Sequence, residues 1–240
     1  NEAIYLWLQF EDGTDPRAAG VIVGGGAGTV TNTGAGSIIR SPGAGVRLIE
    51  GGTVTNGVGA TIQGATAIHV VAGGTVLSNA GTLVGDVLLD GTSVNQVRLF
   101  TGSRTTGQLR IGSQAASTLT LDGTGSQRYS EAVAGVTTFA GSLVKQGSGT
   151  WTLDRASEHA GGTSLKAGRL DLGHNLALGT GRLAMDDGTT LGFAVDGLRI
   201  ANAIHMTGSN DPVIDTGAFD ATLAGAISGG GSLTKQGSGT

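Results

Sequence analysis

The chain has 240 residues, a formal net charge of −4 and a hydrophobic fraction of 38%. Charged residues make up only 13%, and no run of Lys or Arg occurs, which argues against a nucleic-acid partner and against contact with an anionic membrane. The 46 glycines come with only three prolines, which excludes collagen, and the apolar fraction argues against disorder. Because cysteine is absent, no disulfide framework exists and a large regular core is expected.

The first segment, residues 1–27, contains the longest apolar run of the chain, Ile4-Tyr-Leu-Trp-Leu8, and a further aromatic residue at Phe10. That run is too short to span a membrane. The open end of a coil of strands exposes unpaired strand edges and apolar core. We therefore expect residues 1–27 to form an N-terminal cap or edge segment. The alternative is a contact surface for another domain or for a second copy of the chain.

Residues 28–140 consist of short repeats. The phrase GTVTN begins at residues 28 and 52, and GTVLSN begins at 74, so Asn32, Asn56 and Asn79 recur at spacings of 24 and 23. Between them lie apolar runs of three to five residues bounded by Gly, Gly-Gly or Ser-Pro. Glycine at that density costs about 1 kcal/mol each in a helix interior, so no helix is predicted. A propeller blade needs a repeat of about 40–50 residues.

The spacing therefore predicts an all-β fold, a right-handed parallel β-helix (a solenoid) with about 22–24 residues per turn and three short strands in each turn. Successive turns stack about 4.8 Å apart, and alternate side chains point inward to form aliphatic ladders. Each recurring Asn is predicted at a corner, hydrogen-bonded to its counterpart one turn away. A β-sandwich would show strands at 8–12 residue spacing without this self-similarity.

The third segment, residues 141–240, uses a different phrase. GSLVKQGSGT at 141–150 returns as GSLTKQGSGT at 231–240. Residues 141–170 read GSLVKQGSGTWTLDRASEHAGGTSLKAGRL and resemble the autotransporter-associated β-strand repeat. The positions in register are Gly141, Leu143, Lys145, Gly147, Gly149, Thr150, Leu153, Gly161, Gly162, Thr163, Leu165, Gly168 and Leu170. Trp151 stands where that family most often has Leu, and Ser157-Glu158-His159 replaces its usual Asn-x-Tyr bend.

This resemblance implies the passenger domain of a type V secreted protein of a Gram-negative bacterium. It implies a cell-surface or extracellular location at the outer membrane, in a parent protein anchored by a C-terminal outer-membrane barrel. The chain would then be a length of a longer passenger, without membrane contact of its own. The expected function is that of a non-enzymatic adhesin or virulence factor in host attachment or self-association. The alternative is a structural stalk that presents an upstream catalytic domain, a protease.

The expected partners are a host surface protein, the host matrix, a glycan, or another copy of the chain. Contact would rest on ladders of exposed Thr, Ser and Asn on one flat face. A carbohydrate-active β-helix enzyme would instead need acidic and basic residues that converge on one face. Apart from the adjacent pairs Glu11-Asp12 and Asp186-Asp187, the eighteen acidic residues are spread singly along the sequence, so no such site is predicted.

A Ser-x-x-Lys pattern at Ser142 and Lys145 is the one motif typical of a nucleophile. It recurs at Ser232 and Lys235, and a catalytic nucleophile is not usually duplicated with its surroundings. We expect both lysines on the surface at equivalent places about four turns apart, with Leu143 and Leu233 pointing inward.

The remaining candidates are weaker. Gly24-Gly25-Gly26 does not complete a nucleotide-binding loop, and Asp186-Asp187 is expected to form a solvated turn rather than a cation site. The four histidines show no metal-ligand spacing and are expected to be hydrogen-bonded or solvated; they are His69, His159, His174 and His205. The sequence thus predicts no catalytic, cofactor-binding or metal-binding residues and no cofactor, and it does not identify ligand-binding residues.

Overall fold

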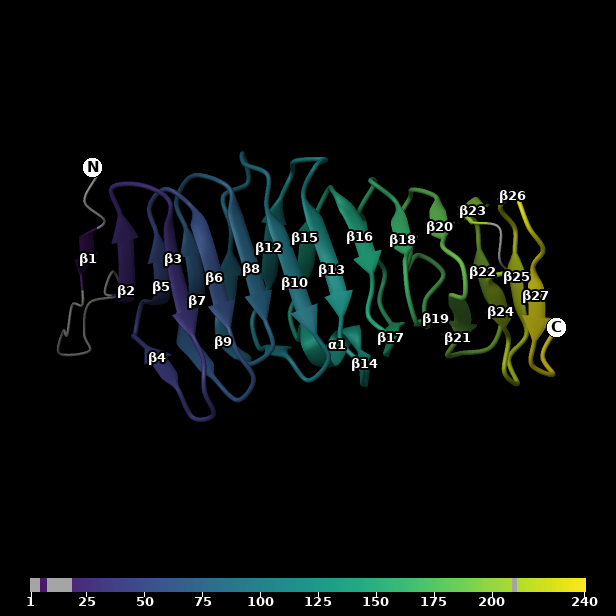
Figure 1. The fold of residues 1–240 in the computed structure, drawn as a ribbon, viewed down its shortest axis with the longest axis horizontal. Helices are drawn as coiled ribbons and strands as arrows, with labels where there is room; N and C mark the ends of the chain where they lie inside the picture. The colour runs from purple at the N-terminus through teal and green to yellow at the C-terminus, as the bar shows by residue number, and fades with distance from the viewer. Residues whose placement is uncertain (1–4, 8–18, 209–210) are drawn as a thin grey trace. The chain divides into compact units, whose positions relative to one another are not determined.

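The computed structural model describes residues 5–7, 19–208 and 211–240 and consists almost entirely of short parallel strands (Figure 1). The predicted all-β parallel solenoid is confirmed. Residues 1–4 and 8–18 of the predicted N-terminal segment lie outside the described part. Across the described ranges, no helix has the length and apolar character needed to cross a membrane. The chain divides into two compact units, residues 1–117 with 132–139 and residues 118–131 with 140–240.

Unit 1 is built from two sets of strands. A nine-stranded sheet contains, in order, β1 Tyr5–Trp7, β2 Ala19–Gly24, β5 Ala44–Leu48, β7 Thr61–Val70, β9 Thr82–Leu88, β12 Leu109–Gly112 and β15 Thr137–Phe139; β4 Ile38–Arg40 pairs with β7 and β11 Arg104–Thr105 pairs with β9. A second set is ordered β10 Gln96–Phe100, β8 Thr75–Asn79, β6 Gly52–Asn56 and β3 Gly28–Asn32. All these pairs are parallel except β1 with β2.

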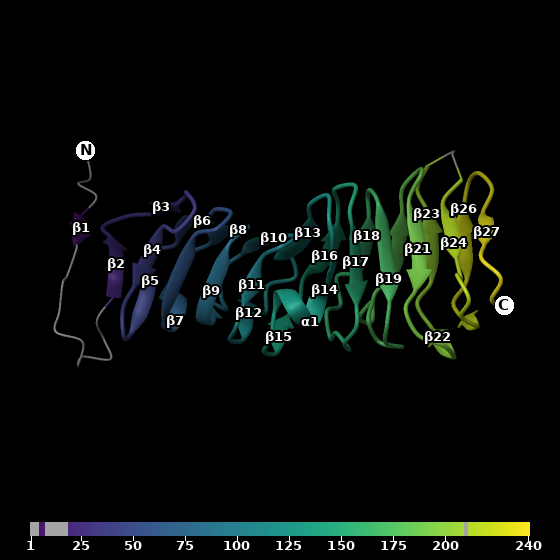
Figure 2. The same ribbon diagram turned by 90° about the horizontal axis from the view of Figure 1, so that it is seen from below.

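Unit 2 contains two sets of six parallel strands and one pair. The first set is β13 Thr118–Asp122, β16 Ser142–Lys145, β18 Thr163–Leu165, β20 Leu183–Met185, β23 Ile204–Met206 and β26 Ile227–Gly229. The second set is β14 Ser126–Arg128, β17 Thr150–Leu153, β19 Arg169–Leu172, β21 Thr190–Phe193, β24 Val213–Asp215 and β27 Thr234–Gln236, and the pair is β22 Leu198–Ile200 with β25 Ala221–Leu223. Figure 2 shows β17, β19, β21 and β24 side by side. The boundaries predicted at 28–140 and 141–240 stay a prediction.

The length of a turn varies around the predicted value while the strands keep their register. Gly28 pairs with Gly52, as the repeated phrase predicts. The turn is shorter where Thr150 pairs with Arg169, and it is longer where Leu109 pairs with Thr137. The corners absorb these differences, because only the strands are held by inter-turn hydrogen bonds.

The interior is lined by stacked aliphatic side chains, as predicted. In unit 1, Val30, Val54, Leu77 and Val97 occupy one inward column, and each is buried. Each such side chain contributes about 1.5–3 kcal/mol by leaving water. In unit 2, the fully buried Trp151 takes the place of a leucine and donates its indole N–H to the Asp122 carbonyl at 2.9 Å, so its one polar atom is satisfied.

Buried asparagines form a second kind of ladder in unit 1. Asn32 Nδ2 donates to Asn56 Oδ1 at 3.0 Å, and Asn56 Nδ2 donates to Asn79 Oδ1 at 2.9 Å. Nδ2 of each donor also contacts a backbone carbonyl, that of Thr61 at 2.9 Å and that of Thr82 at 3.1 Å. The predicted corner ladder is confirmed. It ends at Asn79, whose Nδ2 has no acceptor among the described residues because the next residue in register is a leucine.

The turns approach so closely at one corner that only glycine fits. Gly52 has a φ of 130°, in the region that favours glycine. A Cβ atom at this position would lie 1.9 Å from the carbonyl oxygen of Gly28 in the neighbouring turn. The glycine that opens the repeated phrase at 28 and 52 therefore reflects backbone contact between turns.

One short helix departs from the prediction that the chain is free of helices. Helix α1 spans Tyr129–Ala132. Its first turn is capped, because Glu131 Oε2 accepts a hydrogen bond from the Arg128 backbone N–H at 3.2 Å. The Ser130 backbone N–H donates to Asp154 Oδ1 at 3.0 Å, and the Ser130 hydroxyl donates to Asp154 Oδ2. Capping side chains, rather than an apolar periodicity, produce this single turn.

The asparagine ladder leads to a first prediction. Asn56→Ala removes the middle of the ladder and leaves Asn32 Nδ2 and Asn79 Oδ1 each short of a partner in a buried place. We expect the free energy of unfolding to fall by about 2 kcal/mol. Thr55→Ala, which changes the outward neighbour on the same strand, is the control and should cost less than about 0.5 kcal/mol. Urea unfolding followed by circular dichroism measures both, and equal losses would contradict the ladder's role.

Candidate functional site

The first set of six strands in unit 2 presents an uncharged outer surface, which we call the small-residue face. Its strands alternate buried and half-buried positions, so every second side chain points outward. The outward column in register is Thr120, Val144, Ser164, Ala184, His205 and Ser228. This column carries no acidic residue and no Lys or Arg, and its side chains are short. The sequence analysis expected ladders of exposed Thr, Ser and Asn; Thr120, Ser164 and Ser228 fit that description, whereas no Asn lies in this column.

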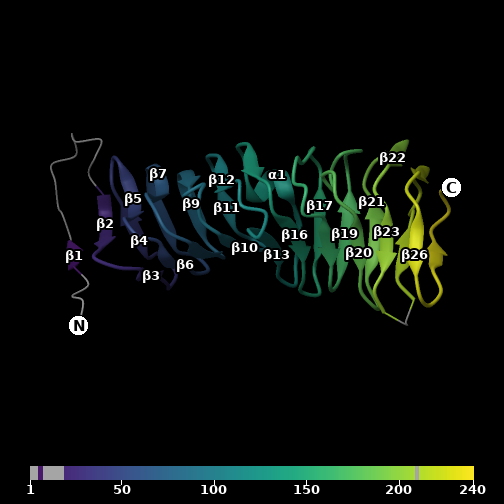
Figure 3. The same cartoon turned by 90° about the horizontal axis from the view of Figure 1, so that it is seen from above.

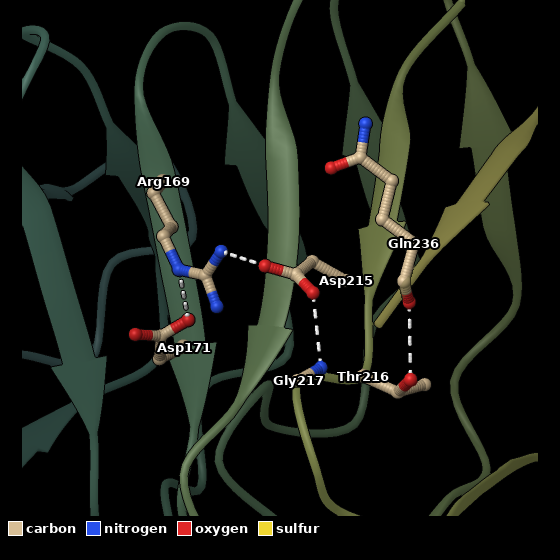
Figure 4. A network of polar contacts seen from close by, with 6 residues as sticks. All are labelled: Arg169, Asp171, Asp215, Thr216, Gly217 and Gln236. Carbon is tan, nitrogen blue, oxygen red and sulfur yellow. Dashed lines mark hydrogen bonds and ion pairs between the residues drawn. The ribbon is translucent and has the colours of Figure 1, made fainter. Parts of the chain in front are cut away.

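The second set of six strands presents the opposite chemistry, on what we call the charged face. Its outward column is Arg128, Thr152, Asp171, Gly192, Asp215 and Gln236. Arg169 lies on the same strand as Asp171, two residues before it, and Nε donates to Asp171 Oδ1 at 2.7 Å. Its Nη1 reaches Asp215 Oδ2 at 2.5 Å, 46 residues away in sequence (Figure 4).

Gly192 makes this reach possible. It lies in register between Asp171 and Asp215 on the intervening strand β21. A Cβ atom at Gly192 would lie 1.9 Å from Asp171 Oδ1 and 2.3 Å from Arg169 Nη2. The missing side chain leaves the space in which the guanidinium crosses the strand.

The two carboxylates share one guanidinium but differ in acidity. Burial raises the pKa of Asp171 above its usual value, although the Arg169 charge opposes this. The hydrogen bond from Arg169 lowers the pKa of Asp215. Asp215 Oδ1 also accepts the Gly217 backbone N–H at 2.9 Å. The Thr216 hydroxyl donates to the backbone carbonyl of Gln236 in the next turn at 3.0 Å (Figure 4). The Arg169–Asp215 contact ties turns together, and both oxygens of Asp215 and one oxygen of Asp171 accept hydrogen bonds here.

The prediction that the acidic residues are spread singly is therefore wrong for Asp171 and Asp215. Sequence reasoning missed the cluster because its members are two turns apart and the turn lengths differ. The signal that could have found it is the in-register glycine between two aspartates, once the strand pairing is known.

The Ser-x-x-Lys motif does not form a reactive pair. On strand β16 Ser142 points outward and Lys145 points inward, so the two side chains lie on opposite sides of the strand. Lys145 is fully buried, and Nζ donates to the carbonyls of Gln146 at 3.0 Å, Gly147 at 2.8 Å and Ala167 at 2.9 Å. The prediction of a surface lysine is wrong, because the three carbonyls at this corner accept all three ammonium protons.

Burial lowers the pKa of the Lys145 ammonium to about 8, and the nearby Asp122 carboxylate partly opposes this effect. The group therefore stays charged at neutral pH. It stabilises the corner between two successive turns through backbone carbonyls, in a place where the sequence suggested chemistry.

The second copy of the phrase occupies a different place in the coil. Lys145 lies in β16 of the first set of strands, which continues from β23 to β26. Lys235 instead lies in β27, which pairs with β24 in the second set. Lys235 is exposed, although Nζ still donates to Gly239 O at 2.6 Å. The predicted equivalence of the two lysines is thus wrong. Leu143 is buried as predicted, but Leu233 is 36% exposed, which contradicts its predicted inward position.

His159 is the most deeply placed ionisable ring. It is fully buried in the bend after β17, where Nδ1 lies 2.7 Å from Ser157 Oγ and Nε2 lies 3.0 Å from Thr163 Oγ1. Thr163 Oγ1 in turn lies 3.4 Å from the Leu178 carbonyl. Burial lowers the pKa of His159 to about 4, so the ring is neutral and hydrogen-bonded. This agrees with the prediction of a satisfied histidine.

Two of the other histidines and Asp186 also form local contacts. His174 Nδ1 accepts the Leu176 backbone N–H at 3.0 Å, and His205 Nδ1 lies 3.2 Å from Ser228 Oγ. Asp186 Oδ1 accepts the Thr207 hydroxyl at 2.5 Å within a turn between strands. In the part of the chain that the structure describes, no group of three or more His, Asp or Glu could hold a metal ion.

Comparisons with known proteins give the chain its context. Residues 143–172 match the model of the passenger-associated-transport-repeat family. The chain is 28% identical over 167 residues, 65% of its length, to "Adhesin BmaC autotransporter" from Brucella suis biovar 1 (strain 1330). It spans only 4% of that relative's length. No solved structure matches the chain.

Lys145 gives a second prediction. Lys145→Met keeps much of the buried volume but leaves three corner carbonyls without a donor, and we expect the free energy of unfolding to fall by about 2 kcal/mol. Lys235→Met, in the repeated phrase on the exposed β27, should cost less than about 0.5 kcal/mol. Urea denaturation of both variants tests this, and a Lys145 variant as stable as the wild type would refute the corner role.

His159 gives a pH-dependent prediction. Its pKa is about 4 in the folded protein and 6.5 when unperturbed, so the unfolded state binds the extra proton between these values. The free energy of unfolding should therefore fall as pH falls from 6.5 to 4, by about 3 kcal/mol from this group. His159→Gln should remove that share of the pH dependence, whereas His174→Gln should not. Unfolding midpoints at pH 7 and 4.5 decide between them, and an unchanged slope in the His159 variant would contradict the account.

Proposed function

We propose that the chain is a non-enzymatic, surface-presented length of an autotransporter passenger that mediates attachment, because residues 143–172 match the passenger-associated-transport-repeat and a relative is named an autotransporter adhesin. The passenger family implies a surface or secreted location through the outer-membrane system. We place this segment at the cell surface or outside a Gram-negative cell. Its partners are a host surface protein, matrix, glycan or another copy of itself.

The small-residue face is the observation that carries this proposal. Short outward side chains such as Ser164 and Ala184 lose little rotamer freedom on contact, so a flat partner can approach at low entropic cost. Hydroxyl groups at Thr120 and Ser164 supply hydrogen bonds to it. Repetition of the same surface at each turn suits many weak contacts summed over a long interface.

The arrangement of the charged side chains supports a non-enzymatic role for this segment. The two acids that do converge, Asp171 and Asp215, are both held by Arg169, and the contact with Asp215 joins different turns. His159 is buried and Lys145 donates to backbone carbonyls only. The relative that shares 28% identity is named an adhesin, which favours attachment over catalysis for this segment.

The test alters the face without touching the core. Ser164→Arg with Ala184→Arg places two long charged side chains on the small-residue face. Beads coated with the chain should adhere to host cells or clump with each other, and the double variant should reduce this at least fivefold. The matched control, Thr180→Arg with Ala201→Arg, adds the same charge at exposed positions outside the strands and should change adhesion less than twofold.

Wild-type beads that neither adhere nor clump would overturn the proposal and leave the segment as a stalk for another domain. Equal losses in the two double variants would show an effect of net charge and would also contradict a role for the face.

A further inference from the structure

The outer surface of the nine-stranded sheet in unit 1 gathers arginines that lie far apart in the sequence. We call this surface the arginine face, and it is formed by Arg40, Arg47, Arg104 and Arg110. Arg47, Arg104 and Arg110 each lie next to a buried residue on their strands, and Arg40 pairs with Gln63, the neighbour of the buried Ile62, so all four side chains point outward. Arg47 is half-buried and the others are exposed. Figure 3 shows β5, β7, β9 and β12 side by side.

The strand register aligns two of these arginines. Arg47 pairs with His69, His69 with Leu88, and Leu88 with Arg110, so these four side chains form one outward column. Three strand spacings separate Arg47 from Arg110, a distance of roughly 14 Å. Arg40 pairs with Gln63, and Arg104 pairs with Thr82. These two pairs align with the part of β7 before its register shift, whereas the column of Arg47 and Arg110 aligns with the part after it.

The guanidinium groups of this surface have no carboxylate within ion-pair distance in the described part of the chain. The four arginines form no ion pair there. Asp86, on the same sheet, accepts hydrogen bonds from Gln108 N at 2.9 Å and Gln108 Nε2 at 3.0 Å instead. Arg47 Nε is enclosed, and the residues that the structure describes offer it no hydrogen-bond acceptor.

By sequence, unit 1 carries six arginines against seven acids, a net charge of −1. Four of these acids lie in the first 18 residues, and residues 19–117 alone carry five arginines against three acids. The whole chain carries −4. Burial, followed by the Arg47 charge, lowers the pKa of His69, in keeping with a positive potential along the column.

We propose that the arginine face binds a linear anionic polysaccharide, sulfated or rich in uronic acid, that runs across strands β5, β7, β9 and β12. Guanidinium groups suit sulfate and carboxylate groups because they donate paired hydrogen bonds. Thr61, Gln63, Thr82 and Thr138 point outward nearby and offer hydroxyl and amide groups to sugar hydroxyls.

The observations favour a polysaccharide over other polyanions. The face is a sheet surface, which has no helix or ribbon to enter a nucleic-acid groove. Attachment to a lipid surface rests on a broad apolar face beside the basic residues, whereas this column offers Leu88 alone, half-buried between His69 and Arg110. The inference rests on the proposed surface location and names one attachment ligand, but it uses a different face from the small-residue face.

Heparin serves as the probe for direct binding to the full 240-residue chain. Wild-type protein should bind immobilised heparin, and affinity should fall as salt rises because bound counterions are released. Arg47→Gln with Arg110→Gln should weaken binding at least tenfold. The matched control is Arg182→Gln with Arg199→Gln, which removes the same charge from exposed positions in unit 2 and should change binding less than twofold.

Thermal unfolding followed by circular dichroism checks that each pair remains folded. If the Arg47 pair does not fold, Arg40→Gln with Arg104→Gln carries the test, with an expected loss of at least threefold. Three results would overturn the proposal: no wild-type binding, equal losses in test and control pairs, or tighter binding to single-stranded DNA or phosphatidylserine vesicles than to heparin. The adhesion assay uses another face, so its failure and failure of this proposal are distinguishable.

Discussion

The parallel hydrogen-bonded register between successive turns is the constraint on which the rest of each unit depends. It places residues of equal phase on top of one another at about 4.8 Å, whatever their spacing in sequence. The side chains of an inward column must then pack or find hydrogen-bond partners in the same surroundings at every turn. Valine and leucine do so by packing, Asn56 by bonding to its counterparts in both neighbouring turns, and Lys145 by donating to three carbonyls at a corner.

The same register gives the outer surfaces their character. Side chains that sequence scatters become neighbours once turns are stacked, so Arg169 meets Asp215 and Arg47 shares a column with Arg110. A column without charge becomes a flat face by the same rule. Surface chemistry in such a protein is therefore a property of columns rather than of local sequence.

The sequence predicts features that recur at a regular spacing. It does not predict features that depend on which set of strands a segment joins. The regular spacing of Asn32, Asn56 and Asn79 is enough to predict the asparagine ladder, because each residue in it bonds its own counterpart. The repeated phrase around Lys145 and Lys235 has nearly the same letters, yet the two copies lie on different faces. Corner lengths between them vary, and no local pattern counts those residues. The Arg169 cluster depends on Gly192, whose role appears only when the pairing is known.

Disulfide trapping in this cysteine-free chain tests the register most directly. Thr53 and Val76 are paired neighbours on β6 and β8, both pointing outward, so cysteines at these positions lie within disulfide reach. Thr53→Cys with Val76→Cys should form an intramolecular disulfide under mild oxidation. Thr53→Cys with Ser78→Cys, shifted by two residues beyond that reach, should not. Equal cross-linking of the two pairs, read by mass spectrometry, would contradict the register and the columns built on it.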